Sequence, residues 1–334
     1  MAQRATSHAL SEAMALVTAG GIHAAAIRAA TLILLIVASA FVPHFTEFGN
    51  VEAILYSIAA VGVGAAGMGV VTINGNLFML SMGATAAVST VLFASLIHLG
   101  LAPTVALVVS AGLLAGLLQG ALIAFADANP IITTIAASSI ISGIGVLWTG
   151  GLTVVGTGDA SWLGSGQVVP WVPNQILVLA VFAVIVGSLL QRTRIGREIR
   201  LIGMQREVAR VAGLRIEAAI LVAYGLAASS AALAGCLIAS AASQGNLTYG
   251  IDLDFNAIAA VLVGGISIRG GRGSVVDAVV GAVFLGVIGN ILLVSGASYE
   301  YQLVVKGAVV LGAVVFGTLA LRLAPRLRKQ QTRA

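Results

Sequence analysis

The chain has 334 residues, of which 59% are hydrophobic and only 9% are charged, and its mean hydropathy is +1.07. An ordinary soluble domain carries about 25% charged residues, so this chain has too little charge to cover a water-exposed surface, which argues against the soluble-enzyme classes. The single cysteine, Cys236, excludes an internal disulfide and a multi-cysteine metal site. The composition predicts an all-α, polytopic membrane protein with one transmembrane domain over residues 1–334.

Ten apolar stretches follow one another along the chain, and a transmembrane helix needs about 20 apolar residues. The expected spans are Ile27–Phe45, Ala53–Ile73, Leu77–Leu101, Pro103–Ala126, Ile131–Gly150, Gln175–Leu190, Ala218–Ala242, Ala257–Ile268, Val275–Val294 and Gln302–Leu323. The eighth is too short to cross alone. We expect it either to borrow residues from Ile251–Asn256 or to be a half-helix supported by its neighbours.

In the fourth span, Gly112, Gly116 and Gly120 form a ridge that lets another helix pack closely, either within one chain or between two chains.

Ten spans sort the charges unequally between the two sides of the membrane. Sixteen of the 17 Lys and Arg residues fall on one side, namely Arg4, Arg28, the seven arginines of Arg192–Arg215, Arg269, Arg272 and the five basic residues of 322–333. The gaps on the other side hold Glu47, Glu52, Asp159, Asp252, Asp254 and Glu300 and no Lys or Arg. The positive-inside rule then predicts cytoplasmic termini. We expect residues 1–26 to form a cytoplasmic or interfacial segment and residues 324–334 to form a basic cytoplasmic tail. Lys306 is the one basic residue that this sorting does not place on the cytoplasmic side.

A polar segment, Arg192–Glu217, separates the sixth and seventh spans. It carries seven Arg and three Glu, and its apolar residues recur near helical spacing. Such amphipathic helices suit docking into a partner's groove, whereas the alternative is a positive loop that only fixes topology. We interpret the segment as a docking element, with candidates Arg197, Ile199, Arg200, Ile202, Arg206, Val208 and Arg210.

Two polar interruptions, Asn74-Gly75-Asn76 and Ser243–Leu247, fall after the second and seventh spans. If spans 2–5 and 7–10 are the two halves, they form an inverted repeat, and breaks at related places point to a transport site. The alternative is that both are surface turns. The candidate path residues are uncharged amides and hydroxyls, namely Asn74, Asn76, Ser81, Gln244, Asn246 and Asn256.

No constellation of catalytic or metal-ligating residues accompanies these breaks. The four histidines are scattered, without a carboxylate or cysteine at useful spacing. Span centres hold almost no acidic residues, so the chain lacks an ionisable group of the kind that ion-coupled carriers place there. We expect no catalytic residue, metal or bound cofactor, and no nucleic-acid partner.

Three strings carry a family resemblance: TRIGREIRLIGMQREVARVAGLRIE, ALAGCLIASAASQGN and LDFNAIAAVLVGGISIRGGRGSVVDAVVGAVFLG, supported by Pro130–Gly151. The chain resembles the ribose-type simple-sugar permeases of bacterial ABC importers. The resemblance implies a ten-helix permease of the bacterial inner membrane that carries a simple sugar or polyol. It implies pairing with a second permease, identical or paralogous, and a periplasmic substrate-binding protein. A cytoplasmic ATPase would hold ATP and Mg and would bind the coupling loop, residues 192–217.

One departure from this family concerns Gly75–Gly83, where these permeases usually read Gly-Gly-Ile-Asp-Leu-Ser-Val-Gly. The aspartate is missing here, which leaves the substrate and the pairing with an identical copy open. The alternatives are a permease for nucleosides or branched-chain amino acids, or an ion-coupled secondary carrier.

Overall fold

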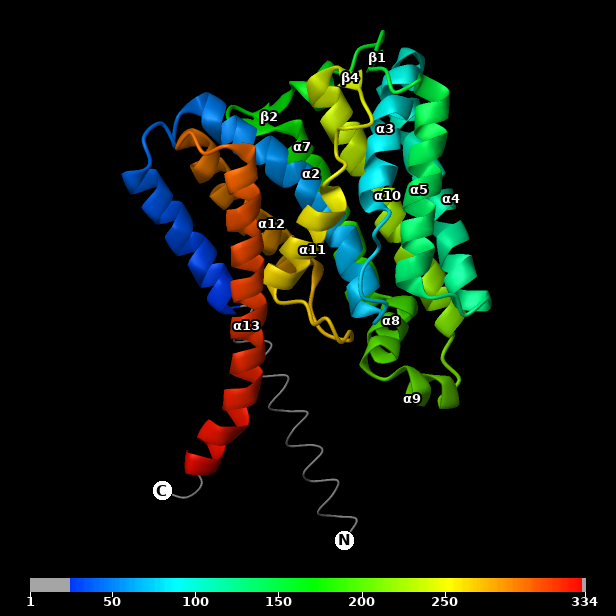
Figure 1. Ribbon diagram of the computed structural model, residues 1–334, viewed down its shortest axis with the longest axis vertical. Coiled ribbons are helices and arrows are strands. Elements are labelled where there is room, and N and C mark those ends of the chain that lie inside the picture. The colour runs from blue at the N-terminus through cyan, green and yellow to red at the C-terminus, as the bar shows by residue number, and fades with distance from the viewer. Residues whose placement is uncertain (1–24, 332–334) are drawn as a thin grey trace.

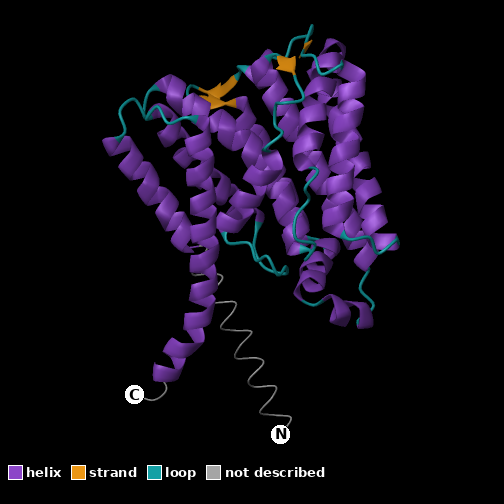
Figure 2. Ribbon diagram, in the orientation of Figure 1, coloured by secondary structure: helices purple, strands orange, loops and turns teal. Residues whose placement is uncertain are grey.

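The fold is a bundle of helices with small strands at one end (Figures 1 and 2). The computed structural model describes residues 25–331, with side chains up to residue 315. The predicted N-terminal segment lies almost wholly outside the described residues. The tail continues the last helix as far as Gln331, and its side chains also lie outside the description.

Seven helices among the described residues are long and apolar enough to cross a membrane. They are α2 (Phe48–Ile73), α3 (Met82–Leu96) with its 3₁₀ extension (Ile97–Leu99), α4 (Leu101–Phe125), α5 (Pro130–Thr149), α7 (Asn174–Arg192), α10 (Ile216–Ala242) and α12 (Val275–Val294). Shorter apolar helices cover Ala25–Phe41 and α11 (Leu253–Gly264), and α13 covers Tyr299–Gln331. The prediction of an all-α polytopic membrane protein is confirmed.

The remaining elements cap the two ends of the bundle. At one end lie α6 (Ser161–Gly164) and two antiparallel strand pairs, β1 (Val154–Val155) with β4 (Gln244–Gly245) and β2 (Gln167–Val169) with β3 (Val172–Pro173) (Figure 2). At the other end lie α8 (Arg194–Met204) and α9 (Arg206–Val211) (Figure 1). We call these the exterior and cytoplasmic ends, following the predicted topology.

The core is built on α2 and α10, whose most apolar stretches are each 78% buried. Small residues make this possible because they let helix backbones approach closely. The glycine ridge of α4 packs against α10 within this chain: a methyl group at Gly112 would lie 2.5 Å from Ala232 Cβ, and one at Gly116 would overlap the Tyr224 carbonyl oxygen.

Two predicted spans differ from the observed helices. The third begins at Met82 and not at Leu77, because residues 76–81 form loop and turn, with Leu77 in the left-handed backbone region (φ of +58°). The eighth, α11, has 12 residues, too few to cross alone, as expected. Asp254 was expected in an exterior gap, but it lies in the first turn of α11. That placement is corrected because α11 begins near the middle of the bundle, where Leu253 packs against Gly64 of α2 (Figure 1).

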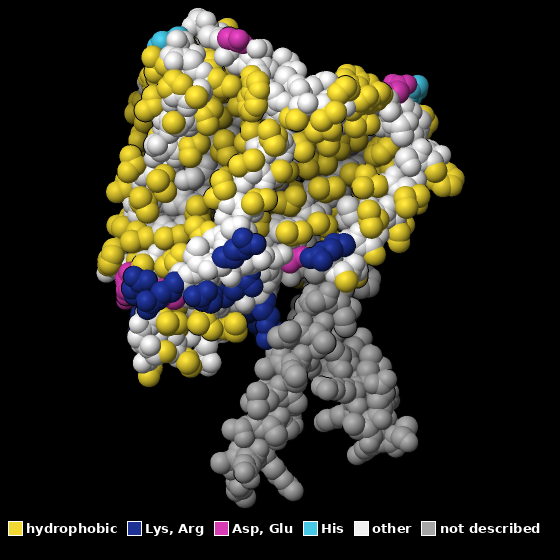
Figure 3. Space-filling view, turned by 180° about the vertical axis from the view of Figure 1, so that it is seen from behind, with side chains coloured by type: hydrophobic (Ala, Val, Ile, Leu, Met, Phe, Trp, Pro, Cys, Tyr) yellow, Lys and Arg dark blue, Asp and Glu magenta, His cyan; other side chains and the backbone are white. Residues whose placement is uncertain are grey.

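Charge is distributed unequally between the two ends. On the face in Figure 3, Lys and Arg side chains gather towards the cytoplasmic end, and the exterior end carries acidic and His side chains. Arg28 is held by Asp277, with 2.6 Å between guanidinium and carboxylate, and Asp277 also accepts a hydrogen bond from Ser274 at the start of α12. This contact fixes the first helix against α12.

Candidate functional site

Two helices, α3 and α11, begin inside the bundle and run in opposite directions, with their N-terminal ends in contact. Gly83 is essential to this contact, since a methyl group there would overlap the Ile251 carbonyl oxygen and lie 3.3 Å from Asp254 Cγ. The N-terminus of a helix carries partial positive charge. Asp254 places its carboxyl group beside both ends, and the Phe255 backbone N–H donates to its Oδ1 at 2.7 Å.

The non-helical segment before α3 is a loop, and side chains satisfy part of its backbone. The Thr72 hydroxyl donates to the Leu77 carbonyl at 2.9 Å, and the Met79 amide donates to the Met68 sulfur at 3.3 Å. Non-helical backbone at membrane depth persists only where protein or a water-filled cavity supports it. Ser81, fully buried at the start of α3, donates to Gln119 of α4 at 2.7 Å.

The second non-helical segment, residues 243–252, consists of the short strand β4 followed by turns and descends from the exterior end to α11. Asn246 is fixed on three sides: its backbone exchanges hydrogen bonds with the Thr90 hydroxyl, its side-chain amide donates to Thr153, and its side-chain oxygen accepts from Thr248. Gln244 donates to the Tyr249 hydroxyl at 2.6 Å. Strand pairing between Val154 and Gly245 ties this segment to the exterior loop.

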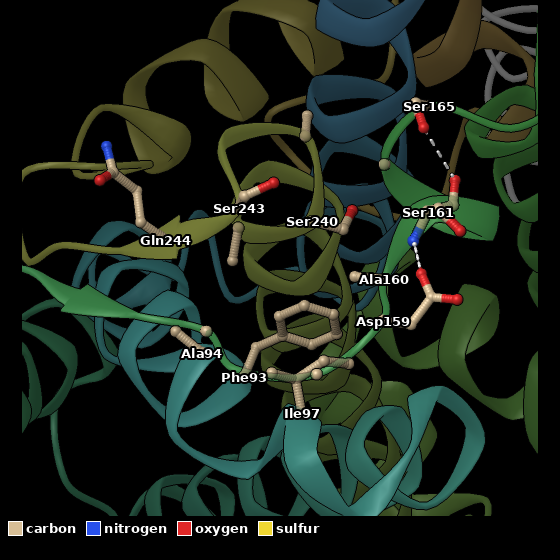
Figure 4. Close-up of a pocket in the computed structure, with 15 residues that line it drawn as sticks. Phe93, Ala94, Ile97, Asp159, Ala160, Ser161, Ser165, Ser240, Ser243 and Gln244 are labelled. Atoms are coloured by element: carbon tan, nitrogen blue, oxygen red, sulfur yellow. Dashed lines mark hydrogen bonds between the residues drawn. The ribbon is translucent and has the colours of Figure 1, made fainter.

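An exterior pocket of about 250 Å³ lies beside this segment, between α3, α6 and the end of α10. In Figure 4, Asp159 and Gln244 lie on opposite sides of it, and Phe93 and Ile97 contribute an apolar wall. Hydrogen bonds from the Ser161 hydroxyl and backbone N–H lower the pKa of Asp159 below its ordinary value, so the pocket carries a carboxylate at neutral pH.

A cytoplasmic pocket of about 260 Å³ lies at the other break. It is lined by Asn74, Gly75, Asn76, Ile202, Gly203, Met204, Arg206, Ile220 and Arg269. Asn74 and Asn76 are buried, and neither side-chain nitrogen has a hydrogen-bond partner among the described residues; the Asn74 oxygen also lacks one.

The six predicted path residues therefore do not form one cluster. Asn74 and Asn76 line the cytoplasmic pocket, Gln244 lines the exterior pocket, and Asn246 braces the exterior break. Ser81 lies at the start of α3, and Asn256 lies in the first turn of α11, donating to the Asp252 carbonyl.

Two residues at the central junction were missed by sequence reasoning. Asp254 was assigned to a loop, and only the start of α11 brings it to Gly83. Gln119 was detectable, because it is the one amide in an otherwise apolar fourth span.

The segment predicted to dock a partner forms α8 and α9, joined at Gln205. Its buried face points into the chain's own core: Ile199 and Ile202 are 0% and 2% exposed and pack in the cluster formed with α2 and α10. The expectation that they enter a partner is wrong in this structure, because helical spacing identifies an apolar face but not what covers it. Val208 and Val211 are 56% and 90% exposed and supply the apolar surface of α9.

The charged candidates of this segment have different surroundings. Arg197 and Arg210 are exposed, and Arg206 lies 4.0 Å from the Asp127 carboxylate. Arg200 is partly buried, and its Nε has no partner among the described residues. Glu198 is buried and accepts from Arg194 at 3.0 Å, with Arg215 at 3.7 Å, so it joins α8 to the start of α10.

Three glycines bring the cytoplasmic segments together, and we call this contact the glycine junction: Gly75, Gly203 and Gly270. A methyl group at Gly203 would overlap the Ile73 carbonyl oxygen, and one at Gly270 would lie 2.6 Å from the Gly203 oxygen and 2.8 Å from Gly75 Cα. Gly75 and Gly270 both have φ of +83°, a backbone region that favours glycine. The Gly271 amide donates to the Ile73 carbonyl at 2.7 Å. The end of α8 thus contacts a turn from each half of the chain.

These features define a membrane permease with two discontinuous helices and a cytoplasmic contact element. The chain belongs to the family described as branched-chain amino acid transport system / permease component, whose model matches residues 50–314. The predicted transport-permease class and multi-pass bacterial membrane location are confirmed.

Three of the similar relatives are named as sugar permeases. The chain is 33% identical to the ribose import permease protein RbsC of Bacillus subtilis, over 85% of this chain and 89% of the relative. It is 32% identical to the L-arabinose transport system permease protein AraH of Escherichia coli, over 85% and 87%. It is 31% identical to the galactofuranose transporter permease protein YtfT of Escherichia coli, over 86% and 87%. The resemblance to the sugar permeases is confirmed. No solved structure matches the chain significantly.

Proposed function

We propose that this chain forms the path for a simple sugar or polyol in a binding-protein-dependent ABC importer of the bacterial inner membrane. The observation that carries the proposal is the similarity to ribose, arabinose and galactofuranose permeases over at least 85% of the chain. The junction at Asp254 supports it, since an uncharged polyol can donate hydroxyl hydrogen bonds to a carboxylate without bringing a second negative charge.

The ten-span topology with cytoplasmic termini and an inverted repeat is part of this proposal. In each half, a central helix (α2 or α10) is followed by a non-helical segment, then a helix that begins inside the bundle, then two further helices. The first half makes this excursion from the cytoplasmic end and the second from the exterior end (Figure 1). Opposite directions of the same element order support an inverted repeat.

The path would run from the exterior pocket, past the junction of α3 and α11, to the cytoplasmic pocket. The six predicted path residues lie along this line and remain candidates. A substrate-binding protein would deliver the sugar at the exterior end, and a second permease, identical or paralogous, would complete the path. An ATPase that holds ATP and Mg would bind the exposed surface of α8 and α9 and act through Gly203.

A permease for branched-chain amino acids is the second candidate, favoured by the description of the matched family. The three relatives named for ribose, L-arabinose and galactofuranose argue against it, since each is 31–33% identical over at least 85% of this chain. Nucleosides and ion-coupled transport remain further alternatives.

The deciding experiment is uptake by proteoliposomes that contain the permease, its ATPase and its binding protein. We expect ATP-dependent uptake of a pentose or hexose, with no uptake of leucine. Uptake driven by an ion gradient without ATP would contradict the proposal, and leucine uptake would favour the second candidate.

A further inference from the structure

The cytoplasmic pocket contains polar groups that the rest of the described chain leaves unused. Asn74 is 3% exposed and Asn76 is 6% exposed. Both Asn74 amide atoms and the Asn76 nitrogen have no hydrogen-bond partner among the described residues. Buried polar side chains are nearly always paired, so these amides are suited to a ligand that carries hydroxyl groups, which both donate and accept.

The same pocket contains two arginines from different segments. Arg206 belongs to α9, and the carboxylate of Asp127 is 4.0 Å away, at the limit for an ion pair. Arg269 belongs to the loop between α11 and α12 and is exposed, with no ion pair or hydrogen bond to its side chain among the described residues. Guanidinium groups bind phosphate oxygens through two parallel hydrogen bonds. No acidic residue lines the pocket.

We propose that this cytoplasmic pocket binds a small soluble phosphate ester that also carries hydroxyl groups, such as a sugar phosphate. The arginines would hold the phosphate, and Asn74 and Asn76 would hold the hydroxyls. The pocket volume of about 260 Å³ lies near the lower end for small-molecule sites, which suits a monosaccharide phosphate and excludes a dinucleotide.

The position of the pocket gives a bound ligand a regulatory consequence, which rests on the proposed function. Its lining comes from the turn after α2, from α8 and α9, and from the loop after α11. Gly75 and Gly203 of the glycine junction belong to that lining. A ligand that contacts all of these segments, and Ile220 of α10 beside them, binds only while they are together, so it favours the arrangement seen in this structure. The phosphorylated product of an imported sugar would then slow further import.

The test is calorimetric titration of the full-length permease in nanodiscs of zwitterionic lipid, without ATPase or binding protein. The probes are ribose 5-phosphate, ribose and inorganic phosphate. We expect saturable binding of ribose 5-phosphate that is at least about tenfold tighter than either of the other probes. Arg269→Gln should weaken it by about tenfold or more. Arg272→Gln is the matched control, because it removes the same charge from the same loop at a residue outside the pocket lining.

Asn74→Ala tests the hydroxyl-binding half of the pocket and should reduce the preference for ribose 5-phosphate over inorganic phosphate. Absence of binding, or equal weakening by Arg269→Gln and Arg272→Gln, would overturn the proposal. A lipid headgroup could offer the same phosphate chemistry, so the titration is repeated with anionic phosphatidylglycerol in the nanodiscs. Loss of ribose 5-phosphate binding in that lipid would assign the pocket to lipid. Because the titration needs no transport, its failure leaves the proposed import function intact.

Discussion

Replacing Gly203 with alanine tests whether α8 acts on the path through the glycine junction. The added methyl group would overlap the Ile73 carbonyl oxygen and lie 2.7 Å from the Gly271 nitrogen. Both neighbours are backbone atoms, so no side chain can rotate away and α8 must move from the turns. Overpacking of this kind costs about 1–3 kcal/mol. Alanine regains about 1 kcal/mol of helix propensity over glycine, so the net penalty is at most about 2 kcal/mol.

The expected result is a folded permease that still binds its ATPase, because the exposed side chains of α9 are unchanged. Coupled uptake in proteoliposomes should fall about tenfold, since 1.4 kcal/mol corresponds to a factor of ten. Gly187→Ala is the matched control: it is another helical glycine, and a methyl group there meets nothing within 4 Å. If both variants transported at the wild-type rate with equal thermal stability, the proposed transmission through Gly203 would be refuted.

Three further predictions address topology, docking and the path. A cysteine at Asp159 should react with an impermeant thiol reagent from outside and one at Gln205 should not; reversed labelling would contradict the ten-span topology. Val208→Asp should abolish co-purification of the ATPase while the amount of permease in the membrane stays unchanged. Ile202→Asp should instead lower the amount of permease, because it buries a charge. Loss of ATPase binding in Ile202→Asp and loss of permease in Val208→Asp would contradict the assigned faces of α8 and α9. Asp254→Asn should reduce sugar uptake by about tenfold, because the substrate loses a hydrogen bond to a charged group. Unchanged uptake would remove Asp254 from the path.

The helices were predictable because membrane thickness sets the length of apolar runs. The sequence also placed both breaks correctly, since Asn-Gly-Asn and Ser-Gln-Gly-Asn interrupt otherwise apolar runs. It could not place Asp254, because an acidic residue beside a polar turn looks the same at the membrane surface and at the start of a half-helix. The contacts of Leu253 with Gly64 and of Asp254 with Gly83 fix its depth.

The segment Arg192–Glu217 shows a second limit. Periodicity correctly indicated an amphipathic helix, but the apolar residues at Ile199 and Ile202 pack inward on the chain's own core. A sequence contains no signal that separates a face covered by its own chain from one covered by a partner. Val208 and Val211 share the same apolar character and are exposed, whereas Ala209 on the same helix is buried in that core, so exposure depends on the face of α9.

The glycine junction explains how one displacement could reach both halves of the path. Contacts through long side chains absorb small movements, because rotamers adjust at little cost. At Gly75, Gly203 and Gly270 the backbones themselves touch, and the Gly271–Ile73 hydrogen bond holds the two turns together. A movement of α8 therefore displaces the turn before α3 and the loop after α11 at the same time. Since α3 and α11 meet again at Gly83 and Asp254, the two turns cannot shift independently of the central junction. We therefore expect a single cytoplasmic contact to bias α3 and α11 together.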